Sequence, residues 1–93
     1  MFFKSKKTVY IVAGYIWEED GHAYPMVSEH AVFSTRGKAM KELREIAKEA
    51  RNEAKEMEYE IKLEYKSDFD TLEIIYPETG TIENWVIYER GIE

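Results

Sequence analysis

A long amphipathic stretch, Ser34 to Met57, constrains the fold more than any other part of the chain. Apolar side chains recur there at three- and four-residue spacing, and Arg, Lys and Glu fill most positions between them. Ser34 or Thr35 can cap the first turn through a hydroxyl oxygen, with Phe33 placed to pack against the helix start. The pattern predicts one helix with a single buried stripe, which has to lie on a sheet. The stripe consists of Ala39, Leu43, Ile46, Ala47, Ala50, Ala54 and Met57.

Strand-like sequence precedes this helix. The run Thr8–Trp17 is β-branched and aromatic with apolar side chains on both faces, which predicts a central strand with Gly14 at a bulge or a close approach. Residues 18–22 form a polar break containing an Asp-Gly pair, a hairpin signal. A second strand is expected over Ala23–Phe33, and Pro25 places it at a sheet edge because proline cannot donate to a ladder.

Strand-like sequence also follows the helix. In Glu58–Lys66 apolar and charged side chains alternate, which predicts a half-buried antiparallel strand with Tyr59, Ile61, Leu63 and Tyr65 on its inner face. Turn residues at 67–70 and 77–80 separate two more expected strands, Thr71–Tyr76 and Ile82–Glu89.

The order strand, strand, helix, strand, strand, strand predicts an α+β fold, an antiparallel sheet with one long helix packed on one face. A chain of 93 residues has room for one hydrophobic core, so we expect a single domain over residues 1–93.

Composition excludes several classes of function. The chain has no cysteine, which rules out disulfides, thiol catalysis and cysteine-bound metals. No apolar run is long enough to cross a bilayer, and the first residues lack a secretory apolar core, so we expect a cytoplasmic protein. The net charge is -6, and residues 58–93 alone hold ten acidic and three basic side chains. These acidic strands would repel nucleic acid and anionic membranes, so we expect neither as a partner of the sheet.

Few residues suggest catalysis or ligand binding. His22 and His30 are the only histidines, with carboxylates near both in sequence. The first belongs to a hairpin tip and the second lies well along the next strand, about 20 Å away at about 3.3 Å per residue. The acidic triplet 18–20 supplies too few oxygens for a closed calcium or magnesium site. No serine or glycine motif for nucleophilic catalysis or phosphate binding is present, so we predict no catalytic residue, no cofactor and no metal site.

The carboxylates of the strand from Glu58 could imitate the phosphate spacing of DNA. Lys62 and Lys66 interrupt that row, which favours an ordinary solvent-facing strand.

Aromatic content is unusually high, with seven tyrosines, four phenylalanines and two tryptophans. One helix covers one face of the sheet, yet the first strand has apolar side chains at both its odd- and its even-numbered positions. We therefore expect something else to bury the apolar side chains of the other face. A second copy in a homodimer is the simplest cover, and another protein or the chain's own loops are the alternatives. Either phase of the first strand could face outward. The expected protein-interaction residues are Tyr10, Tyr15, Trp17, Tyr24, Trp85 and Tyr88.

The segment from Val32 to Ala39, after the hairpin opening at Thr8–Val12, resembles small uncharacterised proteins of bacteria and their phages. In those proteins a strand ends at a Phe-Ser pair and a Lys-Ala step enters the helix. The resemblance covers the first half of the chain, implies an α+β fold and carries no catalytic residue. It also implies a binder that blocks a host or defence protein.

The expected function is therefore a non-enzymatic protein-interaction module, an inhibitor or regulator of phage or mobile-element type. Two alternatives remain at this point. One is a small-ligand-binding or minor enzymatic domain that uses tyrosine, His30 and Glu29 in a pocket against the sheet. The other is a homo-oligomeric accessory protein.

Overall fold

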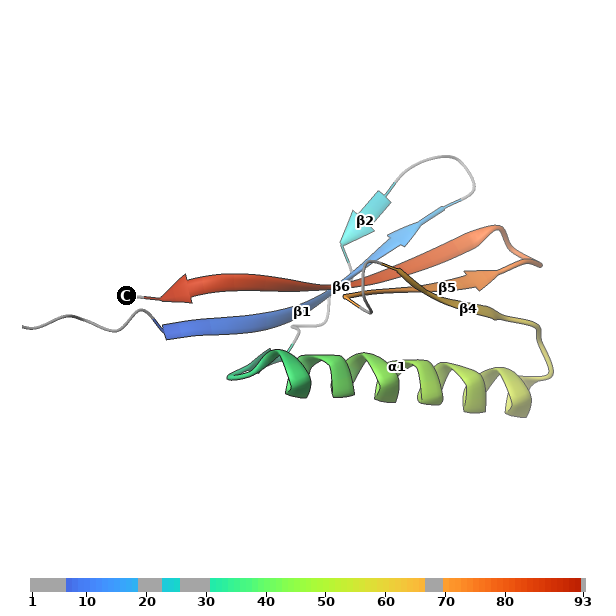
Figure 1. The fold of residues 1–93 in the computed structure, drawn as a ribbon. Helices are drawn as coiled ribbons and strands as arrows, with labels where there is room; N and C mark the ends of the chain where they lie inside the picture. The colour runs from blue at the N-terminus through green and yellow to red at the C-terminus, as the bar shows by residue number, and fades with distance from the viewer. Residues whose placement is uncertain (1–6, 19–22, 26–30, 67–69, 93) are drawn as a thin grey trace, which may run out of the picture.

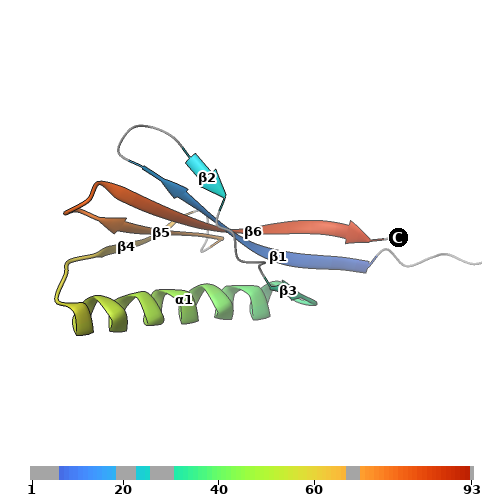
Figure 2. The ribbon, with the colours of Figure 1, turned by 180° about the vertical axis from the view of Figure 1, so that it is seen from behind.

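The computed structural model of the chain describes residues 7–18, 23–25, 31–66 and 70–92. They form one antiparallel sheet with strand order β2-β1-β6-β5-β4, and β3 pairs with β1 off that path. A single long helix lies across one face of the sheet (Figure 1), and the view from behind shows the same two layers (Figure 2). This confirms the predicted α+β fold. The elements are β1 Lys7–Trp17, β2 Ala23–Pro25, β3 Val32–Phe33, α1 Arg36–Met57, β4 Lys62–Lys66, β5 Thr71–Tyr76 and β6 Thr81–Ile92.

The longest ladder joins β1 to β6, from Lys7 opposite Ile92 to Trp17 opposite Ile82. The register is unbroken, so the expected bulge at Gly14 is wrong. Gly14 is buried and stands opposite Trp85. Since β2 and β3 pair with the other edge of β1, the expected central position of this strand is confirmed.

Side chains alternate between the two faces of the sheet along each strand. The even-numbered residues of β1 and β5 and the odd-numbered residues of β4 and β6 face α1. Together with the helix stripe they form the core, which consists of Val12, Ala39, Leu43, Ala47, Leu72, Ile74 and Trp85. Ile46, Ala50, Ile61, Leu63 and Tyr65 pack against its margin, as their spacing predicted.

The helix begins at the expected hydroxyl cap, but its last expected core residue is exposed. Thr35 is the N-cap, and its Oγ1 accepts a hydrogen bond from the Lys38 backbone N–H at 3.2 Å. The Arg36 guanidinium donates to Asp70 Oδ1, with Nε at 2.9 Å, and so ties the first turn to the start of β5. Met57 is 68% exposed, which corrects its assignment to the buried stripe, because the last turn extends past the core.

Two expected strands are shorter than predicted and two are longer, since β1 begins one residue earlier, at Lys7, and β6 is extended at both ends. Glu58 is the C-cap with a left-handed backbone (φ 57°), so β4 begins only at Lys62. The expected strand over Ala23–Phe33 is present as the short strands β2 and β3, while residues 26–30 lie outside the described residues. Pro25 ends β2, an outer strand of the sheet, as expected. The final strand β6 continues to Ile92.

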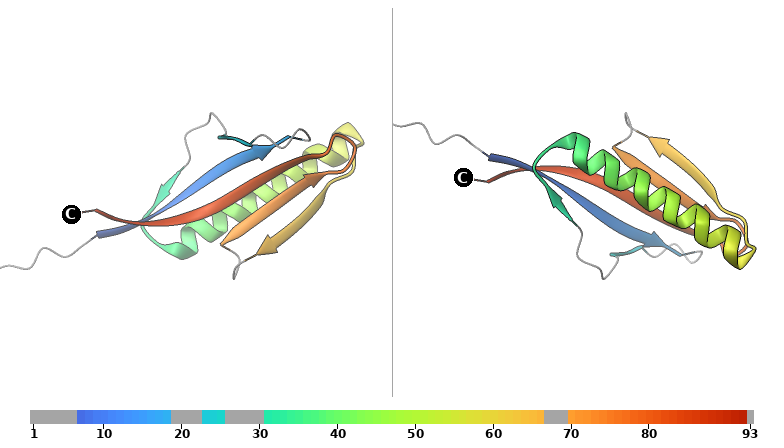
Figure 3. Two further views of the ribbon diagram at one scale, coloured as in Figure 1. Left: turned by 90° about the horizontal axis from the view of Figure 1, so that it is seen from above. Right: turned by 90° about the horizontal axis from the view of Figure 1, so that it is seen from below.

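The views along the sheet normal show how much of the sheet the helix leaves uncovered (Figure 3). Seen from above, all the long strands lie in front of α1, and no second helix of the described residues covers that face. Seen from below, α1 crosses the strands diagonally, with β1 on one side and β4 on the other, and β4 diverges from it. No helix in the described part of the chain is long and apolar enough to cross a membrane.

Candidate protein-binding face

The sheet face opposite α1, which we call the open face, carries an apolar band on its two longest strands. The odd-numbered residues of β1 and the even-numbered residues of β6 point to this side, because the other phase packs against the helix. The band has no helix above it in Figure 3. Its two large exposed side chains are Trp17 and Tyr88, each 45% exposed. The band consists of Val9, Ile11, Ala13, Tyr15, Trp17, Ile82, Val86 and Tyr88.

Two tyrosines in the middle of this band are hydrogen-bonded to each other. The phenolic oxygens of Tyr15 and Tyr88 lie 2.9 Å apart in a hydrogen bond. The two residues are diagonal neighbours across β1 and β6, with the Ala13 and Val86 pair between them. The hydrogen bond from Tyr15, together with burial, raises the pKa of the Tyr88 phenol above its usual value of 10.0. The pair therefore joins β1 and β6 through a side-chain hydrogen bond on the open face.

A row of hydrogen-bonded polar side chains crosses the open face next to the band. The Asn84 amide, with its oxygen turned toward β1, accepts from Nε1 of Trp17 at 3.0 Å and donates to Oε2 of Glu73 at 3.3 Å. The Lys66 ammonium donates to the same carboxylate oxygen at 2.9 Å. The row runs from β1 through β6 and β5 to β4, so most polar groups there are satisfied within the protein.

The structure divides the six expected interaction residues into three groups. Tyr15, Trp17 and Tyr88 lie on the open face, as the expectation required. Tyr10 and Trp85 lie on the helix face, and Trp85 is only 8% exposed, so neither contributes to the open face. Alternation along β1 and β6 is the physical reason for this correction.

The sixth residue, Tyr24, lies in β2 and pairs with Ile16 of β1. Only the backbone of Tyr24 is described. Sequence reasoning missed Asn84, Glu73 and Lys66 as members of the polar row. The alternation of side chains within each strand is visible in the sequence. Which residues of neighbouring strands lie side by side depends on the strand register, which only the structure gives.

Trp85 belongs instead to a polar cluster between α1 and the sheet. Glu83 accepts from the Tyr76 hydroxyl at 2.5 Å and from Nε1 of Trp85 at 3.1 Å. Burial and the Glu83 carboxylate raise the pKa of Tyr76 strongly. The Tyr59 ring lies 6.0 Å from that of Tyr76, and both line a shallow cavity of about 220 Å³. The cluster fixes the end of the sheet through hydrogen bonds.

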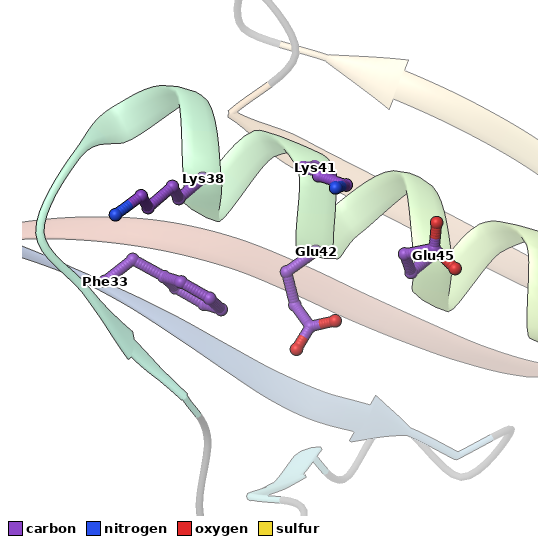
Figure 4. A pocket seen from close by; sticks show the side chains of 5 residues that line it. All are labelled: Phe33, Lys38, Lys41, Glu42 and Glu45. Carbon is purple, nitrogen blue, oxygen red and sulfur yellow. The ribbon is translucent and has the colours of Figure 1, made fainter.

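A larger groove of about 360 Å³ lies between β3 and the first half of α1 (Figure 4). The Phe33 ring forms its apolar part, and Glu42 points from the helix toward the strands beside it. Lys38, Lys41 and Glu45 complete the wall. This lining of one ring and four charged side chains has no polar atoms converging on one point, so it does not define a ligand site.

Apart from Glu18, which is described and exposed, the histidine and carboxylate candidates fall outside the described residues. These are Glu19, Asp20, His22, Glu29 and His30, so the ligand-pocket alternative that uses His30 and Glu29 has no described geometry. Within 7–18, 23–25, 31–66 and 70–92, no three His, Cys, Asp or Glu side chains come together in a way that could hold a metal ion.

No protein family, curated protein or solved structure matches this chain.

Proposed function

We propose that this protein is a non-enzymatic interaction module that binds another protein through the open face. The observation that carries the proposal is the apolar band on β1 and β6, with Trp17 and Tyr88 each 45% exposed and no helix above them. Exposed apolar patches of this kind are typical of surfaces that become buried on association. The proposal extends to an inhibitor or regulator that occupies the surface of a host or defence protein, which the resemblance of the segment Val32 to Ala39 supports.

The chemistry of the open face suits protein binding. Tyrosine and tryptophan dominate interface energetics because they bury a large apolar area with few rotatable bonds. The Tyr15 and Tyr88 hydroxyls already bond to each other, and Trp17 already donates to Asn84. Burying these polar groups under a partner therefore leaves few of them without a hydrogen bond.

The first test measures association of the purified protein. We expect concentration-dependent self-association by light scattering, or binding to a partner protein by pull-down, that the double variant Trp17→Ser and Tyr88→Ser abolishes. The matched control is Met57→Ser, which removes an even more exposed apolar side chain from the far end of α1. Thermal unfolding of all variants verifies that the fold is retained.

A photocrosslinking residue at position 88 then distinguishes self-association from binding to a different protein. A crosslinked homodimer identifies a second copy, and a crosslink to a different chain identifies a heterologous partner. Association that survives the double variant, or that Met57→Ser weakens equally, would contradict binding through the open face.

A further inference from the structure

Between Glu42 and Glu56, α1 carries its charges in two separate stripes. The basic stripe consists of Arg44, Lys48, Arg51 and Lys55, and all four side chains are exposed. The acidic stripe consists of Glu42, Glu45, Glu49, Glu53 and Glu56. Within each stripe the residues follow one another at spacings of three and four, which places like charges on neighbouring helix turns.

The two stripes face opposite sides of the sheet. Glu42 and Glu45 line the groove beside Phe33, so the acidic stripe lies toward β3 and β1 (Figure 4). Arg51 follows Glu42 by nine residues, about two and a half turns at 3.6 residues per turn, so it lies on the opposite side of the helix. That side faces β4, because α1 crosses the sheet between β1 and β4 (Figure 3).

This segregation costs helix stability. Like charges three or four residues apart destabilise a helix by a few tenths of a kcal/mol per pair, and mixing the signs would have stabilised it instead. None of the four basic side chains forms an ion pair with another residue in the described ranges. The positive charge beside β4 is therefore available to a partner.

The strand beside the basic stripe is an edge. In the strand order β4 has β5 as its only neighbour among the described strands. The backbone N–H of Ile87 donates to the carbonyl of Asp70 at 2.9 Å, which fixes the alternation of hydrogen bonds across β6, β5 and β4. By that alternation the even-numbered β4 residues bond β5, and Leu63 directs its backbone N–H and C=O outward. Its side chain lies on the helix face, at the margin of the core.

We propose that the outer edge of β4, together with the basic stripe, binds an acidic polypeptide segment as an added strand. Main-chain hydrogen bonds to Leu63 would supply pairing, as in other cases where a peptide extends a sheet edge. Alternate carboxylates of the segment would lie on the helix face beside Arg44, Lys48 and Arg51, and the intervening apolar side chains would lie on the opposite face of the sheet. This site lies at an edge of the sheet, so it is independent of the open face.

Charge favours an acidic peptide over nucleic acid at this edge. Nucleic acid needs an extended basic surface, and here Glu64 interrupts Lys62 and Lys66 on the same strand. The acidic stripe lies on the other flank of the same helix, and the net charge of the chain is -6. A narrow peptide strand can contact the basic stripe without approaching those carboxylates.

The probe for this site is a fluorescein-labelled eight-residue peptide of alternating Glu and Val, titrated by anisotropy at low and at physiological ionic strength. We expect binding that weakens with salt, and at least about tenfold weaker binding by the double variant Arg44→Glu and Arg51→Glu. The matched control, Lys38→Glu and Arg90→Glu, changes the net charge equally at two exposed positions away from β4, on the groove side of α1 and in β6, and it should retain most of the affinity. The open-face variant Trp17→Ser and Tyr88→Ser should bind the peptide like the parent protein, so failure of this proposal is distinguishable from failure of the proposed function.

Amide hydrogen exchange tests the added strand itself. We expect the peptide to slow exchange of the Leu63 amide, which points outward, and to leave the Glu64 amide, already bonded to β5, unchanged. Equal loss of affinity in both charge variants, an unchanged Leu63 amide, or tighter binding of a single-stranded RNA of equal charge would each overturn the proposal. Peptide binding that is absent at low salt would also overturn it.

Discussion

Removing the Tyr76 hydroxyl tests the polar cluster that holds the end of the sheet against α1. In the folded protein this hydroxyl donates to Glu83 at 2.5 Å from a half-buried position. A hydrogen bond to a charged acceptor contributes about 1.5 to 3 kcal/mol, and Glu83 keeps its second donor, Trp85, when the first is lost. We therefore expect Tyr76→Phe to lower the free energy of unfolding by about 1.5 kcal/mol at neutral pH, measured by urea denaturation with tryptophan fluorescence.

Burial of the phenol, together with the same contact, makes this difference depend on pH. The pKa of Tyr76 is raised strongly in the folded state, whereas in the unfolded chain it is near 10.0. Above pH 10 the unfolded chain releases the proton first, so the stabilisation is complete below that pH and is lost as pH rises toward the folded pKa. At pH 11, one unit above the unfolded pKa, the loss amounts to at most about 1.4 kcal/mol, and solvent around the partly exposed ring screens part of it. We expect the gap between parent and Tyr76→Phe to narrow between pH 9 and 11.

Tyr10→Phe is the matched control, because it removes another phenolic hydroxyl from the helix face of the sheet. A gap that stays constant from pH 9 to 11 would refute the view that burial and Glu83 hold the Tyr76 proton.

Three further substitutions test the fold, each by urea denaturation. Leu43→Ala should cost about 3 to 5 kcal/mol because Leu43 is completely buried between α1 and the sheet, and a cost below about 1 kcal/mol would contradict that packing. Thr35→Ala should cost about 1 kcal/mol, since the Lys38 amide loses its acceptor, with Thr35→Ser retaining most of the stability. Met57→Gln should change stability by less than about 0.5 kcal/mol because the side chain is 68% exposed, and a larger loss would place it back in the core.

Periodicity made the helix and the sheet predictable from the sequence. The spacing from Ala39 to Ala54 gave the buried stripe correctly, since a helix on a sheet buries one face at fixed intervals. Met57 continues the same spacing but lies beyond the last strand contact, and that position depends on where the sheet ends. The left-handed cap at Glu58 was equally hidden, because glutamate has no special preference for that backbone conformation.

The candidate site was predictable only in part. Apolar residues in both phases of β1 indicated that one face would lack a cover, but both phases look alike in the sequence. The register with β6 and the position of the helix decide that Tyr15 faces outward and Tyr10 inward. The charge stripes of α1 can be read from the sequence by counting threes and fours, yet their relation to the edge of β4 requires the strand order.

The position of β6 has a consequence for how the chain acquires its structure. It is the last strand in the chain order, yet it lies in the middle of the sheet, between β1 and β5. Without it the remaining strands fall into two separate groups, β1 with β2 and β3, and β4 with β5. Loop closure between distant segments is slow, so assembly waits for the C-terminal strand to join the N-terminal one. On the ribosome, the sheet cannot be completed until synthesis has passed Ile92, and any product truncated before Thr81 lacks the strand that links the two groups.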